Sequence, residues 1–174
     1  DRLEGVHSDI KLPSRYSYMN IGERDLDGAL KFDRVPEATY NLWNHYENFN
    51  QVVNNSKKRI STSAHFKLID NHAKWLKKSQ DDNVVYLNYE VYKEDLESHK
   101  KESMKYDAIR DYSTSLTFES PLYEKPLLEQ NENLSNKREA WHKNLKKDVY
   151  IEEAINVLSE LKIKPQDQLV KYNY

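Results

Sequence analysis

The sequence of 174 residues contains no cysteine. A chain without cysteine has no disulfide framework, no thiolate zinc site and no cysteine nucleophile. The absence suits an oxidising cell-envelope compartment, although many cytosolic proteins lack cysteine too. Long apolar runs are missing as well, since no stretch approaches the roughly 18 to 20 apolar residues that span a bilayer. We therefore expect no direct membrane insertion.

Glycine is almost as scarce, because the chain has only Gly5, Gly22 and Gly28. A phosphate-binding loop needs glycines that let the backbone approach the anion closely, and a nucleophile elbow needs a G-x-S-x-G pattern. Neither occurs in this sequence. The sequence predicts no nucleotide-binding loop, and we expect no cofactor.

Charged and aromatic residues are abundant. The chain is 32% charged and 37% hydrophobic, and its mean hydropathy is −0.99. Such a composition is typical either of amphipathic helices with long charged faces or of extended disorder. Three Trp, thirteen Tyr and four Phe favour a folded, mostly helical protein. Because the chain starts at Asp1 without an initiator Met, we expect it to be a piece of a longer protein.

The charges are distributed unevenly although the net charge is only −2. Residues Lys57 to Lys78 carry seven cations and one acid, hence +6, whereas Asp81 to Glu97 carry six acids and Lys93, hence −5. We interpret these stretches as helix faces whose charges offset each other in solvent. A nucleic-acid-binding strip is the alternative, which the acidic neighbour disfavours, so we expect no nucleic-acid partner.

Apolar spacings of three and four residues predict four helices. The first covers about 46–60 and the second follows a serine cap at 61–63. A long, thinly buried helix is expected from Tyr89 to Tyr112 after a cap at Asn88, and a final helix follows a cap at Asp148. The inward faces are Tyr46, Phe49, Val52, Val53, Ser56 and Ile60; Phe66, Ile69, Ala73 and Leu76; and Ala154, Ile155, Leu158 and Leu161.

Little regular structure is predicted for the segments outside these helices. Gly5 to Leu12 can form one short strand that lacks a partner in this chain, and Val84 to Leu87 can form a short extended segment. Residues 113–137 contain two prolines without a sustained period, which indicates an irregular segment. The predicted fold class is therefore mainly α, an irregular helical module with one N-terminal orphan strand and a short extended segment near 84–87.

The histidines show no metal-ligand spacing. Asp70 and His72 are the only close histidine and carboxylate pair on a predicted helix, but two residues apart they point to different sides of it. We interpret this pair as solvated surface and predict no metal site. The six histidines are His7, His45, His65, His72, His99 and His142.

Other candidate groups have equally simple explanations. The pair of Ser56 and Lys57 is what chance supplies in a chain rich in both residues, and no glycine-shaped oxyanion hole lies nearby. Asp81 and Asp82 are interpreted as exposed turn acids. Tyr86, Tyr89 and Tyr92 could stack on bases or on a peptide, but their spacing favours core or interface anchors. We predict no catalytic, cofactor-binding or metal-binding residue.

The opening stretch carries a resemblance to a known family. GVHSDIKLP, Gly5 to Pro13, resembles the G-V-x-P-D-I-x-L-P segment that ends the protease domain of carboxyl-terminal processing peptidases, the tail-specific proteases of bacterial cell envelopes. Ile21 to Tyr40 resembles the segment that follows in that family, although Lys31 and Phe32 replace the usual Pro-Trp and Ser8 replaces the first motif's proline. Similar patterns recur in the same order at Ser56 to Ile69, Asn83 to Asn88 and Asp148 to Leu161.

The resemblance implies a domain organisation and a function. Residues 1–20 would end the sheet of a protease domain and form a linker, and residues 21–174 would form a helical C-terminal domain. Members of the family use a serine nucleophile with a lysine base, and a PDZ-type domain captures substrate C-termini. Those motifs lie N-terminal to the matched region, so this chain would inherit no catalytic residue.

We therefore expect a non-catalytic C-terminal module of a periplasmic, tail-specific serine endopeptidase that packs on the protease core and shapes substrate access. Its expected partners are the protease and PDZ domains of the parent protein, the parent's protein or peptide substrates and an envelope adaptor. The alternative is an independent helical domain that docks an adaptor or another protein.

Overall fold

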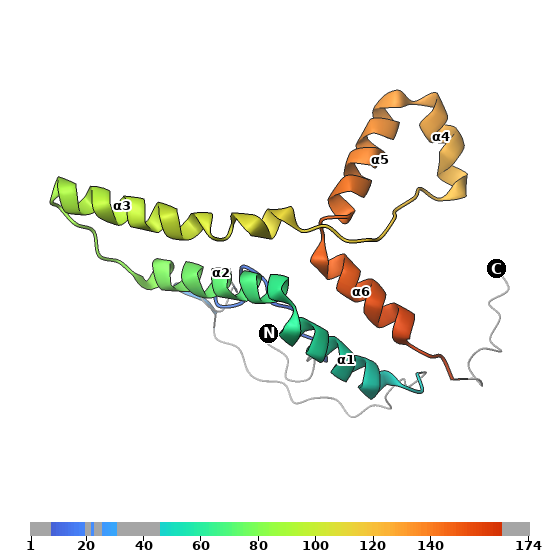
Figure 1. Ribbon diagram of the computed structural model, residues 1–174, viewed down its shortest axis with the longest axis horizontal. Helices are drawn as coiled ribbons and strands as arrows, with labels where there is room; N and C mark the ends of the chain where they lie inside the picture. The colour runs from blue at the N-terminus through green and yellow to red at the C-terminus, as the bar shows by residue number, and fades with distance from the viewer. Residues whose placement is uncertain (1–7, 20–21, 23–25, 31–45, 165–174) are drawn as a thin grey trace. The chain divides into compact units, whose positions relative to one another are not determined.

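The computed structural model describes residues 8–19, 22, 26–30 and 46–164, and most of these residues are helical (Figure 1). The predicted mainly-α class is thus confirmed. The α-helices are α1 (Phe49–Thr62), α2 (Ala64–Asp81), α3 (Tyr89–Met104), α4 (Lys125–Gln130), α5 (Glu132–Leu145) and α6 (Val149–Glu160). The described residues also form two short 3-10 helices, η2 (Asp107–Asp111) and η3 (Leu122–Glu124).

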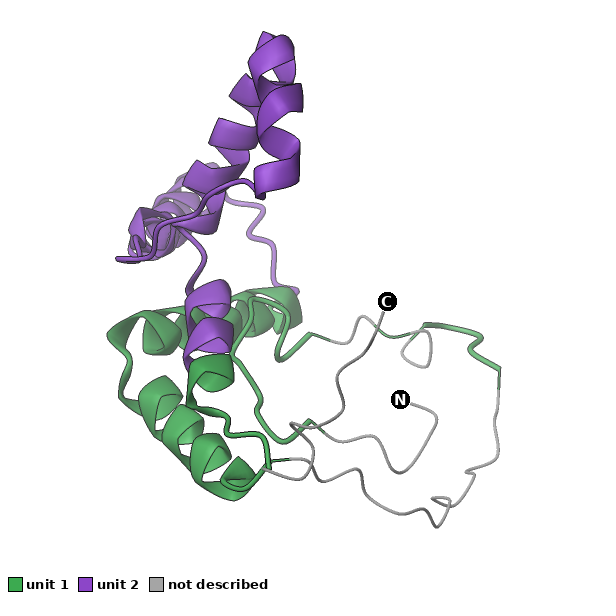
Figure 2. Cartoon of the chain, turned by 90° about the vertical axis from the view of Figure 1, so that its right-hand side faces the viewer, with its two compact units in different colours: residues 1–82, 157–174 green, residues 83–156 purple. Residues whose placement is uncertain are grey.

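The chain divides into two compact units (Figure 2). Unit 1 comprises residues 1–82 and 157–174, and unit 2 comprises residues 83–156. The division between the units falls after α2 and again within α6.

A single residue, Ser63, separates the first two helices. Its backbone is extended (φ −62°, ψ 123°), which ends α1, and its hydroxyl accepts a hydrogen bond from the backbone N–H of Phe66 at 3.3 Å. A serine at this position satisfies a backbone donor that the helix itself leaves unpaired. The predicted serine cap is confirmed, and the two helices follow each other without a longer loop.

The core of unit 1 is formed by residues of α1 and α2. Val52 and Val53 of α1 are buried, and so are Phe66, Ile69 and Ala73 of α2. Their spacing of three and four residues places each set on one helix face, as the sequence predicted. Ser56 of α1 is completely buried in the same face.

The third helix buries none of its side chains. Asn88 caps it as predicted, since its side-chain oxygen accepts hydrogen bonds from the N–H groups of Glu90 (3.0 Å) and Val91 (3.2 Å). The α-helix ends at Met104, earlier than the predicted Tyr112, and the 3-10 helix η2 follows.

The predicted irregular segment at 113–137 is much shorter in the structure. Residues 113–120 lack regular structure, but η3, α4 and the first turn of α5 fill the rest. Pro126, one of the two prolines in this segment, lies in the first turn of α4. Proline is tolerated there because the first N–H groups of a helix have no partner within the helix. With 6 residues, α4 is too short for its periodicity to be recognised. No residue of α5 is buried, so its apolar positions mark no inward face.

In unit 2, α4 and α5 pack against each other as a helical hairpin (Figure 1). Asn131 caps α5 by accepting a hydrogen bond from the N–H of Leu134 at 3.0 Å. An ion pair of 2.7 Å joins Arg138 of α5 to Glu124 of η3, and the Arg138 guanidinium lies 5.0 Å from the ring centre of Trp141. These contacts close the hairpin.

The final helix buries a different face from the predicted one. Asp148 caps it as expected, with its carboxylate accepting hydrogen bonds from the N–H groups of Tyr150 (2.9 Å) and Ile151 (3.2 Å). However, Ala154, Ile155 and Leu158 are exposed, whereas Val149 and Glu153 are buried. The prediction failed because only apolar residues were assigned to the inward face, whereas the structure buries the charged residue Glu153.

The segment before α1 is described only in parts. Residues 8–12 of the predicted strand pair with no strand in the described chain, and residues 5–7 lie outside it. A turn joins Leu26 to Ala29, with the Ala29 N–H donating to the Leu26 carbonyl at 3.1 Å. Gly28 takes φ +80° in this turn, a conformation that favours glycine because it has no Cβ.

Candidate functional site

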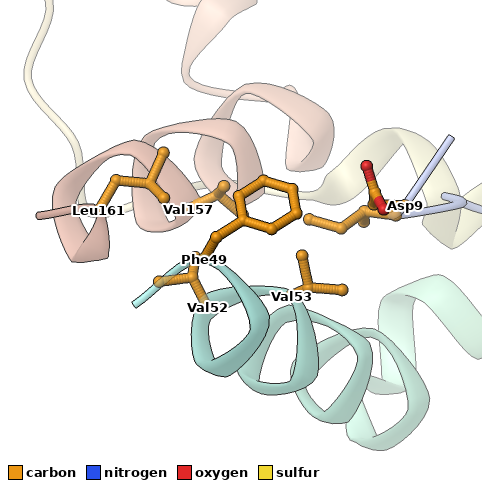
Figure 3. A pocket seen from close by; sticks show the side chains of 7 residues that line it. Asp9, Phe49, Val52, Val53, Val157 and Leu161 are labelled. Atoms are coloured by element: carbon orange, nitrogen blue, oxygen red, sulfur yellow. The ribbon is translucent and has the colours of Figure 1, made fainter. Parts of the chain in front are cut away.

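An apolar groove in unit 1 is lined by three segments that lie far apart in the sequence (Figure 3). Its volume is about 240 Å³. One wall comes from α1 and another from the end of α6, and the N-terminal segment contributes the rest. The lining residues are Asp9, Ile10, Phe49, Val52, Val53, Val157 and Leu161.

Polar contacts beside this groove tie the end of α6 to the start of α1. The carboxylate of Glu160 forms an ion pair with Arg59 and accepts a hydrogen bond from Asn55 at 2.8 Å. The Asn48 amide donates to the Glu160 carbonyl at 2.7 Å and accepts from the Lys162 N–H at 2.9 Å. A short antiparallel bridge between Tyr46 and Ile163 continues this contact.

These neighbours also set the ionisation of Glu160. The hydrogen bond from Asn55, and then the hydrogen bond and positive charge of Arg59, lower the pKa of the Glu160 carboxyl below its usual value. The carboxylate is therefore charged at neutral pH and keeps its ion pair.

The N-terminal segment is attached to α2 by a second polar cluster. The Tyr18 hydroxyl donates a hydrogen bond of 2.7 Å to Asp70, and Lys74 forms an ion pair of 2.7 Å with the other oxygen of the same carboxylate. Lys74 also lies 5.8 Å from the centre of the Tyr18 ring. Hydrogen bonds from Lys74 and Tyr18 lower the pKa of Asp70, and the hydrogen bond to Asp70 raises the pKa of Tyr18.

A third polar contact lies within unit 2. The Tyr112 hydroxyl donates a hydrogen bond to the Glu152 carboxylate. Burial, followed by this hydrogen bond and the negative charges of Glu152 and Glu153, raises the pKa of Tyr112 to about 12. The contact fixes the segment after η2 to the first turn of α6.

The histidines that the sequence singled out do not converge. The Asp70 carboxylate faces Tyr18 and Lys74, while His72 stacks on Trp75 with ring centres 5.9 Å apart. Burial, and secondarily the charge of Arg15, lowers the pKa of His72, and burial lowers the pKa of His65. His99 lies 3.8 Å from Asp95, and His142 lies beside Trp141, whereas His7 and His45 fall outside the described residues.

The other candidate pairs are also accounted for by local structure. Ser56 is buried in α1 whereas Lys57 is exposed, and Asp81 forms an ion pair of 2.7 Å with Lys77. Asp82 is the C-terminal cap residue of α2. Among the described residues, no group of three or more His, Asp or Glu side chains is arranged to hold a metal ion.

The predicted tyrosine anchors and the basic stretch lie on the surface. Tyr86, Tyr89 and Tyr92 are exposed, so they form no core in the described part of the chain. Of the seven cations between Lys57 and Lys78, Arg59, Lys74 and Lys77 are engaged in ion pairs. Pairing reduces the charge that this stretch offers to a polyanion.

Six of the side chains that line the groove are apolar, and only Asp9 is charged. Sequence periodicity identified Phe49, Val52, Val53 and Leu161 as apolar face positions, but it gave no signal for Asp9, Ile10 or Val157 as their neighbours. Tyr18 and Glu160 were also missed, since hydrogen bonds between distant segments leave no local pattern. No helix in the described chain is long and apolar enough to cross a membrane.

Helices with buried apolar side chains, hydrogen bonds and ion pairs between distant segments, and a small apolar groove together define a helical domain. A family model described as the C-terminal domain of tail specific protease (DUF3340) matches residues 16–162. The chain therefore belongs to this family. Searches of curated proteins and of solved structures found no match.

Proposed function

We propose that this C-terminal domain is a non-catalytic module that packs on the protease core of its parent protein and shapes substrate access to the active site. The observation that carries the proposal is the exposed apolar surface of unit 2. Large apolar side chains from Val84 to Leu96 are exposed, and α3 has no buried residue. Soluble domains rarely leave large contiguous apolar patches uncovered, so exposed apolar side chains in this number favour a covering partner.

The proposal includes the enzyme class and location of the parent. The motif resemblance implies that the parent is a serine endopeptidase that recognises protein C-termini. It also implies that the parent acts in the periplasm or cell envelope. The absence of cysteine is compatible with an oxidising compartment. Fractionation of cells that express the tagged parent tests the location, and recovery in the cytoplasmic fraction contradicts it.

The full-length protease with residues 21–174 deleted tests the function. We expect a lower melting temperature, because the apolar surface of the protease core that the module covers becomes exposed. We also expect altered relative cleavage of a folded and an unfolded substrate that share one C-terminal sequence. A short peptide substrate is the control, since its cleavage reports whether the catalytic core is still intact. An unchanged melting temperature together with unchanged cleavage of both protein substrates contradicts the proposal.

A second candidate is docking of an envelope adaptor protein, which the exposed rings of Tyr86, Tyr89 and Tyr92 favour. Calorimetric titration of the full-length protease with isolated envelope proteins tests this candidate. It predicts binding that Tyr89→Ala weakens, with cleavage of the short peptide unchanged.

A further inference from the structure

Residues 8–19 contain no helix or strand, yet they are not a free linker. Their aliphatic side chains are only partly exposed, whereas those of a free linker would stand fully in water. The family model begins at residue 16, so part of this segment precedes the matched domain and still contacts its helices. The partly exposed aliphatic residues are Ile10, Leu12, Pro13 and Met19.

The first attachment point is Ile10. Together with Asp9 it lines the apolar groove whose other walls come from α1 and from the end of α6 (Figure 3). The wall that contains Leu161 is held in place by the ion pair of Glu160 with Arg59. An aliphatic side chain between two such walls loses contact with water, which favours the attached position.

The second attachment point is Tyr18, which contacts α2. Its hydroxyl donates a hydrogen bond of 2.7 Å to the Asp70 carboxylate, and the Lys74 ammonium lies 5.8 Å from the centre of its ring. Lys74 also pairs with Asp70 at 2.7 Å, so the acceptor is held in position. A hydrogen bond to a charged acceptor is stronger than one between neutral groups.

A local turn fixes the backbone next to the second attachment point. The Ser17 N–H donates to the Ser14 carbonyl at 3.0 Å, and the Met19 N–H donates to the Tyr16 carbonyl at 3.1 Å. The Ser14 N–H in turn donates to the Ser17 hydroxyl at 2.8 Å. Tyr18 is therefore presented to α2 from a hydrogen-bonded turn.

Two attachment points remove the freedom of the chain between them. Rotation of the backbone between Ile10 and Tyr18 requires one of the two contacts to open. In a protein that has this region as its C-terminal domain, the chain from the protease enters the domain through this segment. The direction of entry is then set by the surface of α1, α2 and α6.

We propose that residues 8–19 form a strap that fixes the orientation of this domain on the protease domain, with Ile10 and Tyr18 as its two anchors. The domain turns relative to the protease domain only when an anchor opens. The inference deepens the proposed function and rests on it in one respect, namely that the module packs on the protease core.

Limited digestion of the full-length protease with trypsin tests the strap. Trypsin cuts after Lys11 and Arg15, whose side chains are exposed within this segment. A bound segment is cut only after it leaves the surface, so the rate follows the population of the open form. Both bonds should be cut about tenfold or more slowly than in a peptide of residues 8–19. Cleavage as fast as in the peptide overturns the inference.

Two matched variants test the Tyr18 anchor. Tyr18→Phe keeps the ring but removes the donor to Asp70, so cleavage after Arg15 should become about three- to tenfold faster. Tyr16→Phe is the control and should leave the rate unchanged, because the Tyr16 hydroxyl makes no hydrogen bond in the described structure. Equal rates in the two variants overturn the assignment of Tyr18 as an anchor.

Substitutions at distant positions test both contacts. Asp70→Ala should also speed cleavage after Arg15, and Tyr18→Phe should add little to it, since the two residues share one hydrogen bond. Ile10→Ala should mainly speed cleavage after Lys11. Melting temperatures show whether the variants fold. Folded variants with unchanged cleavage at both bonds overturn the two anchors.

A distance distribution measures the orientation itself. One spin label is placed at Lys78→Cys, an exposed position of α2, and the other in the protease domain of the full-length protein. The distribution should be narrow in the otherwise unmodified protease and in Tyr16→Phe, and broad in the double variant Ile10→Ala and Tyr18→Phe. A broad distribution without these substitutions, or a narrow one in the double variant, overturns the role in orientation.

These results separate the inference from the proposed function. If trypsin cuts the segment as fast as the free peptide but deletion of residues 21–174 alters stability and substrate access, the proposed function stands and the strap is wrong. If the strap behaves as expected but the deletion changes neither property, the strap stands and the proposed function is wrong.

Discussion

Tyr112 shows how the fold changes the chemistry of a single side chain. Its phenol is partly buried and donates a hydrogen bond to Glu152, with the charge of Glu153 also nearby. All of these influences favour the neutral phenol over the phenolate, and its pKa is raised to about 12. The folded state therefore holds its proton to higher pH than the unfolded state does.

We predict that Tyr112 makes the fold sensitive to alkali. Between pH 10, near the pKa of an unfolded tyrosine, and about 12, the folded state binds more protons, so the free energy of unfolding falls as pH rises. Tyr112→Phe should remove much of this dependence and cost about 1 kcal/mol at neutral pH. Chemical denaturation across this pH range measures both effects. Tyr92→Phe, at an exposed tyrosine, is the control, and an identical slope in all three proteins contradicts the prediction.

We predict that Glu160 makes the stability of the fold sensitive to acid, whereas Tyr112 makes it sensitive to alkali. Its pKa is lowered by Asn55 and Arg59, so its contribution is present above the unfolded value of about 4.5 and is lost as pH falls through the folded pKa. Thermal unfolding of Glu160→Gln should lose less stability between pH 5 and 3 than the unmodified chain. The same loss in both proteins argues against this role. Glu129→Gln, at an exposed position of α4, should behave as the unmodified chain does.

Among the elements, α2 and α3 are helices of similar length with opposite burial. Both begin with a side-chain cap, from Ser63 and Asn88 respectively. However, α2 buries Phe66, Ile69 and Ala73, and α3 buries nothing in the described structure. The same capping interaction should therefore have different consequences in the two helices.

Removing the caps tests this difference. Ser63→Ala should lower the global stability by about 1 kcal/mol, because α2 carries the core of unit 1. Asn88→Ala should mainly speed amide exchange within α3, since a helix without buried side chains opens locally. Denaturant titration combined with hydrogen exchange separates local from global opening. A global loss in Asn88→Ala as large as that in Ser63→Ala contradicts the prediction.

For the whole molecule, buried apolar side chains are concentrated in one place. Among the described residues, five of the six buried hydrophobic residues lie on α1 and α2, and the sixth is Val149. The most stable part of the chain should therefore be this helix pair.

We predict that amides of α1 and α2 exchange most slowly and those of α3 fastest. Phe66→Ala, at a side chain only 3% exposed, should cost about 3 to 5 kcal/mol and remove the protection of both helices. In the isolated chain Leu87→Ala should leave the free energy of unfolding almost unchanged, because the Leu87 side chain is fully exposed to water. Equal protection of α2 and α3 would show that stability is not centred on this core.

Local patterns allowed much of the fold to be predicted. Two helices on either side of Ser63, the caps at Asn88 and Asp148 and the core positions on α1 and α2 all follow from residue spacing and capping chemistry. The prediction was wrong for α4 and most of the predicted irregular segment, since short helices show little periodicity. It was also wrong for the inward face of α6, because Glu153 is buried.

The amino-acid sequence by itself determined the helical class, the positions of the main helices and the motif resemblance that the family match supports, because each depends on residues close together in the chain. Only the tertiary structure decided that Glu160 meets Arg59, that Tyr18 meets Asp70 and that Asp9 and Ile10 complete the groove. Those contacts depend on how distant segments pack. Packing energy is shared among many residues and leaves no spacing in the sequence from which the partners could be inferred.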